Sequence, residues 1–533
     1  MSKETSPRRF LPPRGIWLLF AVCLALATWL QISQATGDRG ATNVTEFGLF
    51  LVCALTAGVW FTFFSAFDKK LRFGVPGALA ALLVVFVSLF RMEGVAGEMA
   101  PQFVWRFNET ADRALELPPP ASADRIDLVT TGPWDFPQFL GPGRDLSVAA
   151  VVLSRDWDSQ PPELIWRQPI GAGWSGFAVV NGYAITQEQR GDLEMITCYE
   201  VETGELVWSH TRENRFDSFV AGIGPRATPT IDEGIVYALT SNGVLLALNG
   251  ADGAVLWERD LPADYGLSPQ QELATVLYGR ANSPLVVGPL VIVPAGGLPG
   301  GRLTSLVAFD KKSGEKIWEG GNRQISYSSP SIATLAGVEQ VLTVNEASAS
   351  GHYLESGEVL WTITRPGVTA ADPNASQAVP VPPNRVFVSK GYGLGGALFE
   401  LAAQPDGTMS VHEVWNSSRV LRTKFTNVTI YDGHIYGLSD GILECVDLET
   451  GERVWKHGRY HQGQILRSHD LLIVVSEEGE VFLVEASPER RDNVLGSFQA
   501  LSGKTWNNFA LYGPYLVVRN AAEAAVYRLP LIN

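Results

Sequence analysis

The chain has 533 residues, of which 46% are hydrophobic, and its formal net charge is −15 at pH 7. Residues 1–91 hold nine Lys and Arg against four Asp and Glu, so the remainder carries a net charge of about −20. Such an acidic remainder excludes nonspecific nucleic-acid binding, which needs clustered positive charge. The chain also has no CxxC, P-loop, GxSxG or HExxH motif, so these signatures of metal, nucleotide and hydrolase sites are absent.

Three apolar stretches without charge, residues 16–33, 47–67 and 73–90, are each about long enough to cross a bilayer as a helix. Basic residues precede the first stretch and separate the second from the third, whereas only Arg39 separates the first from the second. The positive-inside rule therefore predicts a cytoplasmic tail over residues 1–15 and an extracytoplasmic remainder. The first stretch is alternatively a cleaved signal, because it follows a basic segment. The predicted side of the remainder is the same in both cases.

Residues 92–131 are polar, have little periodicity and include Pro118-Pro119-Pro120. This composition predicts an extended linker between the membrane segments and the rest of the chain. Near its start, Trp105 and Phe107 are predicted to lie at the bilayer interface, where aromatic side chains are enriched.

A repeated phrase dominates residues 132–533: a hydrophobic strand, a polar turn with Gly, and a Trp four residues after that Gly. The five full copies end at Trp208, Trp257, Trp318, Trp361 and Trp455. Weaker copies end at Trp415 and Phe498, and Trp166 precedes the first full copy without strands of its own. Short strands and tight turns repeated every 40 to 60 residues predict an all-β fold, an eight-bladed β-propeller.

Two further expectations follow from the repeats. The strand of Trp166 is predicted to complete the blade built by the C-terminus, which would close the ring and remove exposed sheet edges. The repeated Trp side chains are predicted to pack between neighbouring blades, because a repeated aromatic is typical of a core.

The repeat phrase resembles that of the pyrroloquinoline-quinone (PQQ)-like propeller family. The opening Trp134-Asp135-Phe136-Pro137-Gln138-Phe139-Leu140-Gly141-Pro142-Gly143-Arg144 is similar to the lead-in of many bacterial members. The resemblance covers about residues 134–530 and implies an eight-bladed propeller. It leaves the chemistry open, since the family includes quinoprotein dehydrogenases and an outer-membrane assembly lipoprotein.

Several features of the enzymes in this family are missing. The chain has no adjacent cysteines and no CxxCH haem motif, and no Asp or Glu matches the context of the Ca²⁺ ligand or the catalytic Asp. No catalytic residue and no metal-binding set is therefore assigned.

A propeller binds ligands at its central channel, and the residues just before each innermost strand reach one rim of that channel. Aligning the repeats gives eight such stretches, which contain five potential cations and no acid. The sequence predicts an anionic ligand that stacks on aromatic rings there. The candidate residues are Trp174, Arg226, Arg280, Asn282, Tyr327, Gln377, Lys424, Asn427, His461, Gln464, Lys504 and Trp506. The alternative is that these side chains satisfy backbone groups or ordered water in the channel.

Three functions remain open. The favoured one is a non-catalytic scaffold in the inner membrane, whose periplasmic propeller binds a protein partner or a small anionic ligand and assists envelope assembly. The second is a quinoprotein oxidoreductase with PQQ and Ca²⁺, which oxidises an alcohol or a sugar and passes electrons to the membrane. A sensor is ranked last, because the predicted cytoplasmic parts leave little room for an output domain.

Overall fold

The computed structural model describes residues 9–33, 36–116, 126–489, 491 and 493–532. Residues 1–8 of the predicted tail and residues 117–125 of the predicted linker, with its three prolines, lie outside the described residues. The chain divides into two compact units, Met1–Glu109 and Thr110–Asn533.

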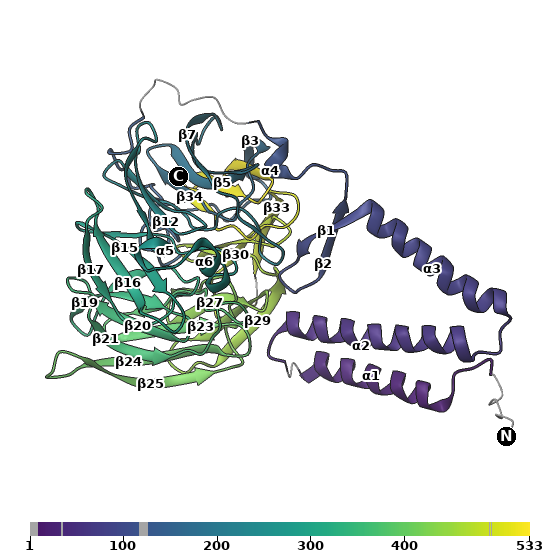
Figure 1. The fold of residues 1–533 in the computed structure, drawn as a ribbon. Helices are drawn as coiled ribbons and strands as arrows, with labels where there is room; N and C mark the ends of the chain where they lie inside the picture. The colour runs from purple at the N-terminus through teal and green to yellow at the C-terminus, as the bar shows by residue number, and fades with distance from the viewer. Residues whose placement is uncertain (1–8, 34–35, 117–125, 490, 492, 533) are drawn as a thin grey trace. The chain divides into compact units, whose positions relative to one another are not determined.

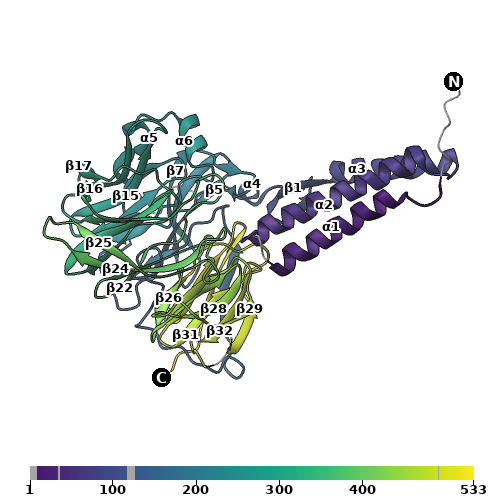
Figure 2. The same ribbon diagram turned by 90° about the horizontal axis from the view of Figure 1, so that it is seen from below.

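The first unit contains three long apolar helices, α1 (Arg14–Ser33), α2 (Arg39–Val59, continued by the π-helical turn η1, Trp60–Phe64) and α3 (Lys69–Leu89). All three are long and apolar enough to cross a membrane. The second begins eight residues earlier than its predicted stretch, because Asp38 accepts a hydrogen bond from Ala41 N (2.8 Å) and caps the helix there. Figures 1 and 2 both show α1 and α2 side by side.

The prediction of an extended linker over residues 92–131 is wrong at its start, where the chain forms a hairpin. Strands β1 (Phe90–Val95) and β2 (Pro101–Trp105) form an antiparallel hairpin directly after α3. The short helix α4 (Ala111–Ala114) follows in the second unit, and Leu128 is buried among propeller side chains. A bulge between Met92 and Gly94 interrupts the alternation of side chains along the hairpin, so the sequence pattern does not predict its strands.

The second unit confirms the eight-bladed propeller. Each blade is a four-stranded antiparallel sheet, and neighbours in the chain pair as neighbours in the sheet. The first four blades are β4–β7 (Ala178–Val180, Tyr183–Arg190, Leu193–Glu200, Leu206–Glu213), β10–β13 (Thr230–Asp232, Ile235–Leu239, Val244–Asn249, Val255–Asp260), β14–β17 (Leu285–Val287, Leu290–Gly297, Leu303–Asp310, Lys316–Gly320) and β18–β21 (Ser331–Leu335, Val338–Val344, Ser348–Tyr353, Val359–Thr364).

The remaining four blades continue the pattern. Strands β5 and β34, from opposite ends of the propeller sequence, are drawn close together in Figure 1. These four blades are β22–β25 (Val379–Val381, Arg385–Lys390, Gly395–Ala403, Met409–Ser417), β26–β29 (Thr429–Tyr431, His434–Ser439, Ile442–Asp447, Arg453–Arg459), β30–β33 (Gln464–Ser468, Leu471–Val475, Glu480–Glu485, Val494–Gln499) and β34–β36 (Ala510–Tyr512, Tyr515–Arg519, Glu523–Arg528) with β3 (Glu163–Pro169). Between the blades lie the ribbon β8–β9 (Asp217–Ser218, Gly222–Ile223) and helices α5 (Leu261–Asp264) and α6 (Pro269–Thr275).

The eighth blade is closed as predicted. Strand β3, which carries Trp166, pairs with β36 at the end of the chain. The side chain of Arg519 crosses from this blade to the first, where it donates to Thr186 Oγ1 (2.8 Å) and Gly171 O (2.7 Å). Two distant parts of the sequence therefore share one sheet, and the ring has no open junction there.

The Trp and Gly of the repeat phrase form one contact between adjacent blades. Trp208 donates its Nε1 hydrogen to Gly250 O of the next blade (2.9 Å), and its ring lies against Gly253. A Cβ atom on Gly253, whose φ is +73°, would lie 2.6 Å from that ring. The same pairing recurs for Trp166 with Gly204, Trp257 with Gly314, Trp318 with Gly357 and Trp415 with Gly451. The predicted packing of Trp between blades is thus confirmed, and Gly is required by both the turn and the contact.

The lead-in segment bonds to the inner strands of several blades. Phe136 pairs with Val179 of the first blade, and Val148 N donates to Arg467 O of the seventh (2.9 Å). Between them, Arg144 is buried and donates to Ser283 O (3.0 Å) and Pro284 O (2.8 Å). Burial lowers the pKa of Arg144 to about 9. The segment therefore ties non-adjacent blades together from inside the ring.

We expect Trp208→Ala to lower the free energy of unfolding by about 3–5 kcal/mol, because it removes a buried indole and leaves a cavity. The measurement is the melting temperature of the purified full-length chain in detergent. Trp134→Ala is the control, since Trp134 is 45% exposed and its contact with Gly513 is not part of the repeat phrase. Equal losses for the two variants would contradict a special role of the contact between blades.

Candidate functional site

The eight stretches before the inner strands meet in a ring of hydrogen bonds. In the first three blades, Gly176 N donates to Thr228 Oγ1 (3.1 Å) and Thr228 N donates to Ser283 Oγ (2.9 Å). Ser283 N then donates to Ser329 Oγ of the fourth blade (2.8 Å). A short polar side chain at the start of one inner strand thus accepts from the backbone of the blade before it.

The four amide candidates take part in the same ring. Asn427 Oδ1 accepts from Gln377 N (2.8 Å), and Gln377 Nε2 donates to Ser329 O (3.1 Å). Asn282 Nδ2 donates to the carbonyls of Ser326 (2.9 Å) and Ser328 (2.6 Å). Gln464 Nε2 donates to the carbonyls of Phe425 (3.3 Å) and Trp506 (2.9 Å). These contacts join blades, so the structure supports the alternative in which channel side chains satisfy backbone groups.

Arg280 is not exposed at the rim. Its side chain is 1% exposed, lies 2.6 Å from Glu272 Oε1 of α6, and donates to the carbonyls of Pro294 and Ala295 (2.9 Å each). The ion pair and both hydrogen bonds occupy the guanidinium, so Arg280 fixes the insertion of α5 and α6 to the third blade.

Arg226 is also directed inward. It donates to Gly224 O (2.9 Å) and Ala221 O, and its guanidinium carbon lies 5.0 Å from the ring centroid of Phe216. Burial lowers the pKa of Arg226 to about 10. Its guanidinium group is therefore bonded to the loop that precedes its own blade.

Trp174, Trp506 and Lys504 do come together. The two indole centroids are 4.9 Å apart, and Lys504 Nζ lies 4.4 Å from the centroid of Trp506 and 5.2 Å from that of Trp174. Phe425 extends the group, with its ring centroid 5.0 Å from that of Trp506. The group contains the cation and the flat apolar surface that the sequence predicted. The cation, Lys504, itself lies over both indole rings.

The other three candidates have different neighbours. Tyr327 packs on Tyr278, with centroids 5.4 Å apart, and burial raises its pKa. Lys424 Nζ lies 5.7 Å from the ring of Tyr392. His461 has a φ of +50°, and its Nε2 atom lies 3.7 Å from Glu478 Oε1.

Acidic side chains contact the eight stretches although the stretches themselves contain none. Glu272 pairs with Arg280, and Glu477 accepts from Trp506 Nε1 (3.0 Å) and from Gln462 N (3.1 Å). With Glu478 near His461, these carboxylates come from α6 and from the turn between β31 and β32. The predicted excess of cations over acids at the rim is therefore wrong. The alignment compares only one part of each repeat, and it omits the loops that fold over that part.

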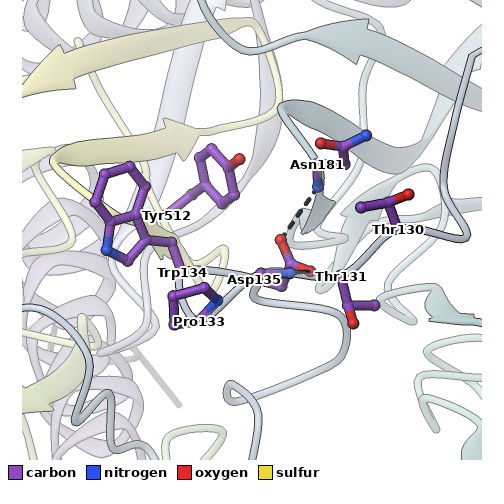
Figure 3. A pocket seen from close by; sticks show the side chains of 8 residues that line it. Thr130, Thr131, Pro133, Trp134, Asp135, Asn181 and Tyr512 are labelled. Atoms are coloured by element: carbon purple, nitrogen blue, oxygen red, sulfur yellow. Dashed lines mark hydrogen bonds between the residues drawn. The ribbon is translucent and has the colours of Figure 1, made fainter.

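A small pocket opens where the lead-in meets the first and last blades (Figure 3). Trp134 and Tyr512 form one side, with their rings perpendicular at 6.5 Å, and Thr130 lies on the other. Asp135 accepts hydrogen bonds from Asn181 N (3.1 Å) and Gly132 N (2.8 Å). The volume is about 130 Å³, well below the roughly 300–1,000 Å³ of typical small-molecule sites. Sequence reasoning missed this pocket, because its walls come from three separated segments.

Exposed apolar side chains lie on several loops that the repeat alignment also omitted. The strands of a blade alternate in direction, so connections between blades and turns between second and third strands share the face of the rim. Five large apolar residues on such loops are exposed: Phe219, Leu273, Leu277, Leu298 and Val368. Tyr278 Oη donates to Ala370 O (3.1 Å), which joins two of these loops.

A family model described as outer membrane protein assembly factor BamB matches residues 158–319 and 270–457, more than half of the chain. The chain belongs to this family. Two relatives with that same description come from Yersinia pestis, 22% identical over 48% of this chain and 60% of the relative, and from Moranella endobia, 26% identical over 37% and 48%. The chain thus spans about half to three fifths of the length of these curated relatives.

The structure of a europium-containing methanol dehydrogenase is similar to the BamB-family propeller described here. The TM-score is 0.57 at 12% identity, and the alignment covers 75% of this chain and 98% of the other. At this identity the likeness shows the fold alone.

The predicted PQQ and Ca²⁺ fit this BamB-family rim poorly. Among the described residues, no group of three or more His, Cys, Asp or Glu side chains is placed to hold a metal ion. Ca²⁺ takes six to eight oxygen ligands, and the carboxylate nearest the indole pair, Glu477, already accepts from Trp506 and Gln462. Of the five predicted cations, Arg226 is bonded to the loop before its blade and Arg280 is paired with Glu272. PQQ binding therefore stays a prediction.

We expect Arg280→Ala to lower the free energy of unfolding by about 3–5 kcal/mol, because Glu272 is left buried without its partner. The melting temperature of the full-length chain measures the loss. Lys504→Ala is the control, since the contacts of its cation with the two rings are worth about 0.5–2 kcal/mol. An unchanged melting temperature for Arg280→Ala, together with loss of anion binding, would instead make Arg280 a ligand residue.

Proposed function

We propose that this protein is a membrane-anchored, non-catalytic scaffold whose propeller lies outside the cytoplasm and binds protein partners during envelope assembly. The observation that carries the proposal is the match to the BamB family over residues 158–457. The relatives from Yersinia pestis and Moranella endobia are described as factors of outer-membrane protein assembly, and this role is extended here to the present chain.

The rim geometry supports a binding role over a chemical one. The amide candidates Asn282, Gln377 and Gln464 are bonded between blades, and Arg280 is paired with Glu272. What the face presents to a partner is instead its set of exposed apolar loops, where Phe219 is 58% and Val368 is 54% exposed. Large exposed apolar side chains on one face are typical of protein interaction sites.

Three apolar helices support the anchoring. An odd number of spans places the two ends of the helical unit on opposite sides of a bilayer, and Lys69, Lys70 and Arg72 between α2 and α3 favour the cytoplasm for that loop. The propeller is then periplasmic, and the protein acts from the inner membrane. A partner in transit to the outer membrane, before its insertion, fits this location.

We expect a photo-crosslinking residue in place of Leu277 to form discrete adducts with envelope proteins in the native host. Leu277 is exposed on the apolar loops, so a partner seated there would lie within reach of the probe. The same probe in place of Lys312 is the control, because Lys312 is exposed on the turn between β16 and β17, on the opposite face. Gel analysis of the adducts is the measurement, and equal labelling at both positions would contradict docking on the rim face.

We expect calorimetric titration of the full-length chain with PQQ, with and without Ca²⁺, to give no binding heat, because the rim cations and Glu477 are already engaged. The parent chain and Lys504→Ala are compared. Tight, Ca²⁺-dependent binding that Lys504→Ala abolishes would overturn the scaffold proposal in favour of a quinoprotein oxidoreductase.

A further inference from the structure

The hairpin β1–β2 of the first unit has one apolar face. Phe90 pairs with Trp105 and Met92 pairs with Phe103 across the two strands. Paired residues of an antiparallel hairpin lie on the same face, as do residues two apart along a strand. These four side chains therefore share one face, and Arg91 and Val104, which pair with each other, lie on the other.

Most of this apolar face is uncovered within its unit. Phe103 is 47%, Trp105 41% and Met92 37% exposed. Phe107 follows the hairpin at 70% exposure, with its ring centroid 5.8 Å from that of Trp105. An aromatic surface of this kind is costly to leave in water.

The face continues the surface of the third apolar helix. Phe86, in the last turn of α3, stacks on Phe90 at 5.0 Å and meets Phe103 edge-on at 5.1 Å. Phe90 in turn meets Trp105 at 5.4 Å. One file of aromatic rings thus runs from the end of α3 onto the hairpin.

Both ends of the hairpin are fixed to helix ends. Arg106 Nη2 donates to Val87 O (2.7 Å), a carbonyl in the last turn of α3 that has no partner within the helix. At the tip, Asn43 Nδ2 of α2 donates to Glu98 O (2.8 Å), and Arg39 Nε lies 3.1 Å from Glu98 Oε2. The hairpin therefore connects the end of α3 to the start of α2, and Figure 1 shows β1 and β2 between these two helix ends.

We propose that the hairpin is a membrane-surface element, whose face of Phe90, Met92, Phe103 and Trp105, together with Phe107, lies in the interfacial layer of the lipid bilayer. The inference rests on the proposed anchoring by three spans, in which the start of α2 and the end of α3 reach the same side of the membrane. Its partner is the boundary between lipid headgroups and acyl chains, where Trp and other aromatic side chains are favoured.

The depth of the hairpin follows from its backbone. A two-stranded hairpin leaves the outer N–H and C=O groups of both strands unpaired, and such groups are not tolerated in the hydrocarbon core. They find water and headgroup partners only at the interface. The apolar face then points toward the acyl chains, and the chain leaves the membrane surface after Phe107 rather than at the end of α3.

The test uses the full-length chain in vesicles of phosphatidylcholine and phosphatidylglycerol. A nitroxide label is attached to single cysteines that replace Phe103, Phe107, Glu93 or Val84, in a background where Cys23 and Cys53 are replaced by Ala. Cys198 and Cys445 are 0% exposed in the propeller and are left in place. Collision of the label with oxygen, which concentrates in lipid, is compared with collision with a water-soluble nickel chelate.

We expect labels at Phe103 and Phe107 to collide preferentially with oxygen, and the label at Glu93 to collide preferentially with the chelate. Glu93 is the matched control, because it is exposed in the same hairpin and stands out of the pairing at the bulge. Phe107 lies outside both strands, so its replacement tests the inference even if Phe103→Cys disturbs the hairpin.

The label at Val84, in the middle of α3, separates the two proposals. Suppose that the label at Val84 prefers oxygen while the labels at Phe103 and Phe107 prefer the chelate. This result would overturn the interfacial hairpin and leave the anchor intact. Preference for the chelate at Val84 would overturn the anchoring itself. Protection of Phe103 and Phe107 from both reagents would mean that protein, either the propeller or a second copy, covers the face, and this too would overturn the inference.

Discussion

The packing of a tryptophan from one blade on the turn glycine of the next is the contact on which the propeller depends. Trp208 on Gly253 shows its two parts: a hydrogen bond from the indole to the neighbouring turn, and ring contact that only a residue without Cβ permits. The turn needs a positive φ, which Gly adopts without strain. One residue type thus satisfies the local turn and the contact between blades, so the repeat phrase specifies both the blade and its attachment.

Closure adds a constraint that no single repeat contains. Strand β3 pairs with β36, and Arg519 extends from the last blade to Thr186 and Gly171 of the first. Inside the ring, Arg144 of the lead-in bonds to the third blade. These contacts join segments more than 100 residues apart, and they hold the inner strands at fixed positions. A scaffold that binds partners through loops benefits from such a rigid support.

The closed ring also decides what its polar side chains do. Asn282 and Gln377 lie where channel ligands bind in other propellers, yet their amides donate to carbonyls of neighbouring blades. A buried carbonyl without a partner costs free energy, so these side chains stabilise the ring. The surface left for recognition is the set of loops, including the α5–α6 insertion fixed by Arg280 and Glu272.

The amino-acid sequence by itself determined the eight blades, their closure by the strand of Trp166, and three apolar helices. Each of these follows from local patterns, namely a Gly and a Trp at fixed spacing or an uncharged apolar run of sufficient length. The sequence also predicted that Trp174, Trp506 and Lys504 lie at one rim of the propeller. Only the tertiary structure decided that Arg280 is paired with Glu272, that Glu477 reaches the indole pair, and that residues 90–105 form a hairpin with an aromatic face. The physical reason is that burial and pairing of a side chain depend on loops and strands that arrive from elsewhere in the chain, and a repeat alignment cannot place them.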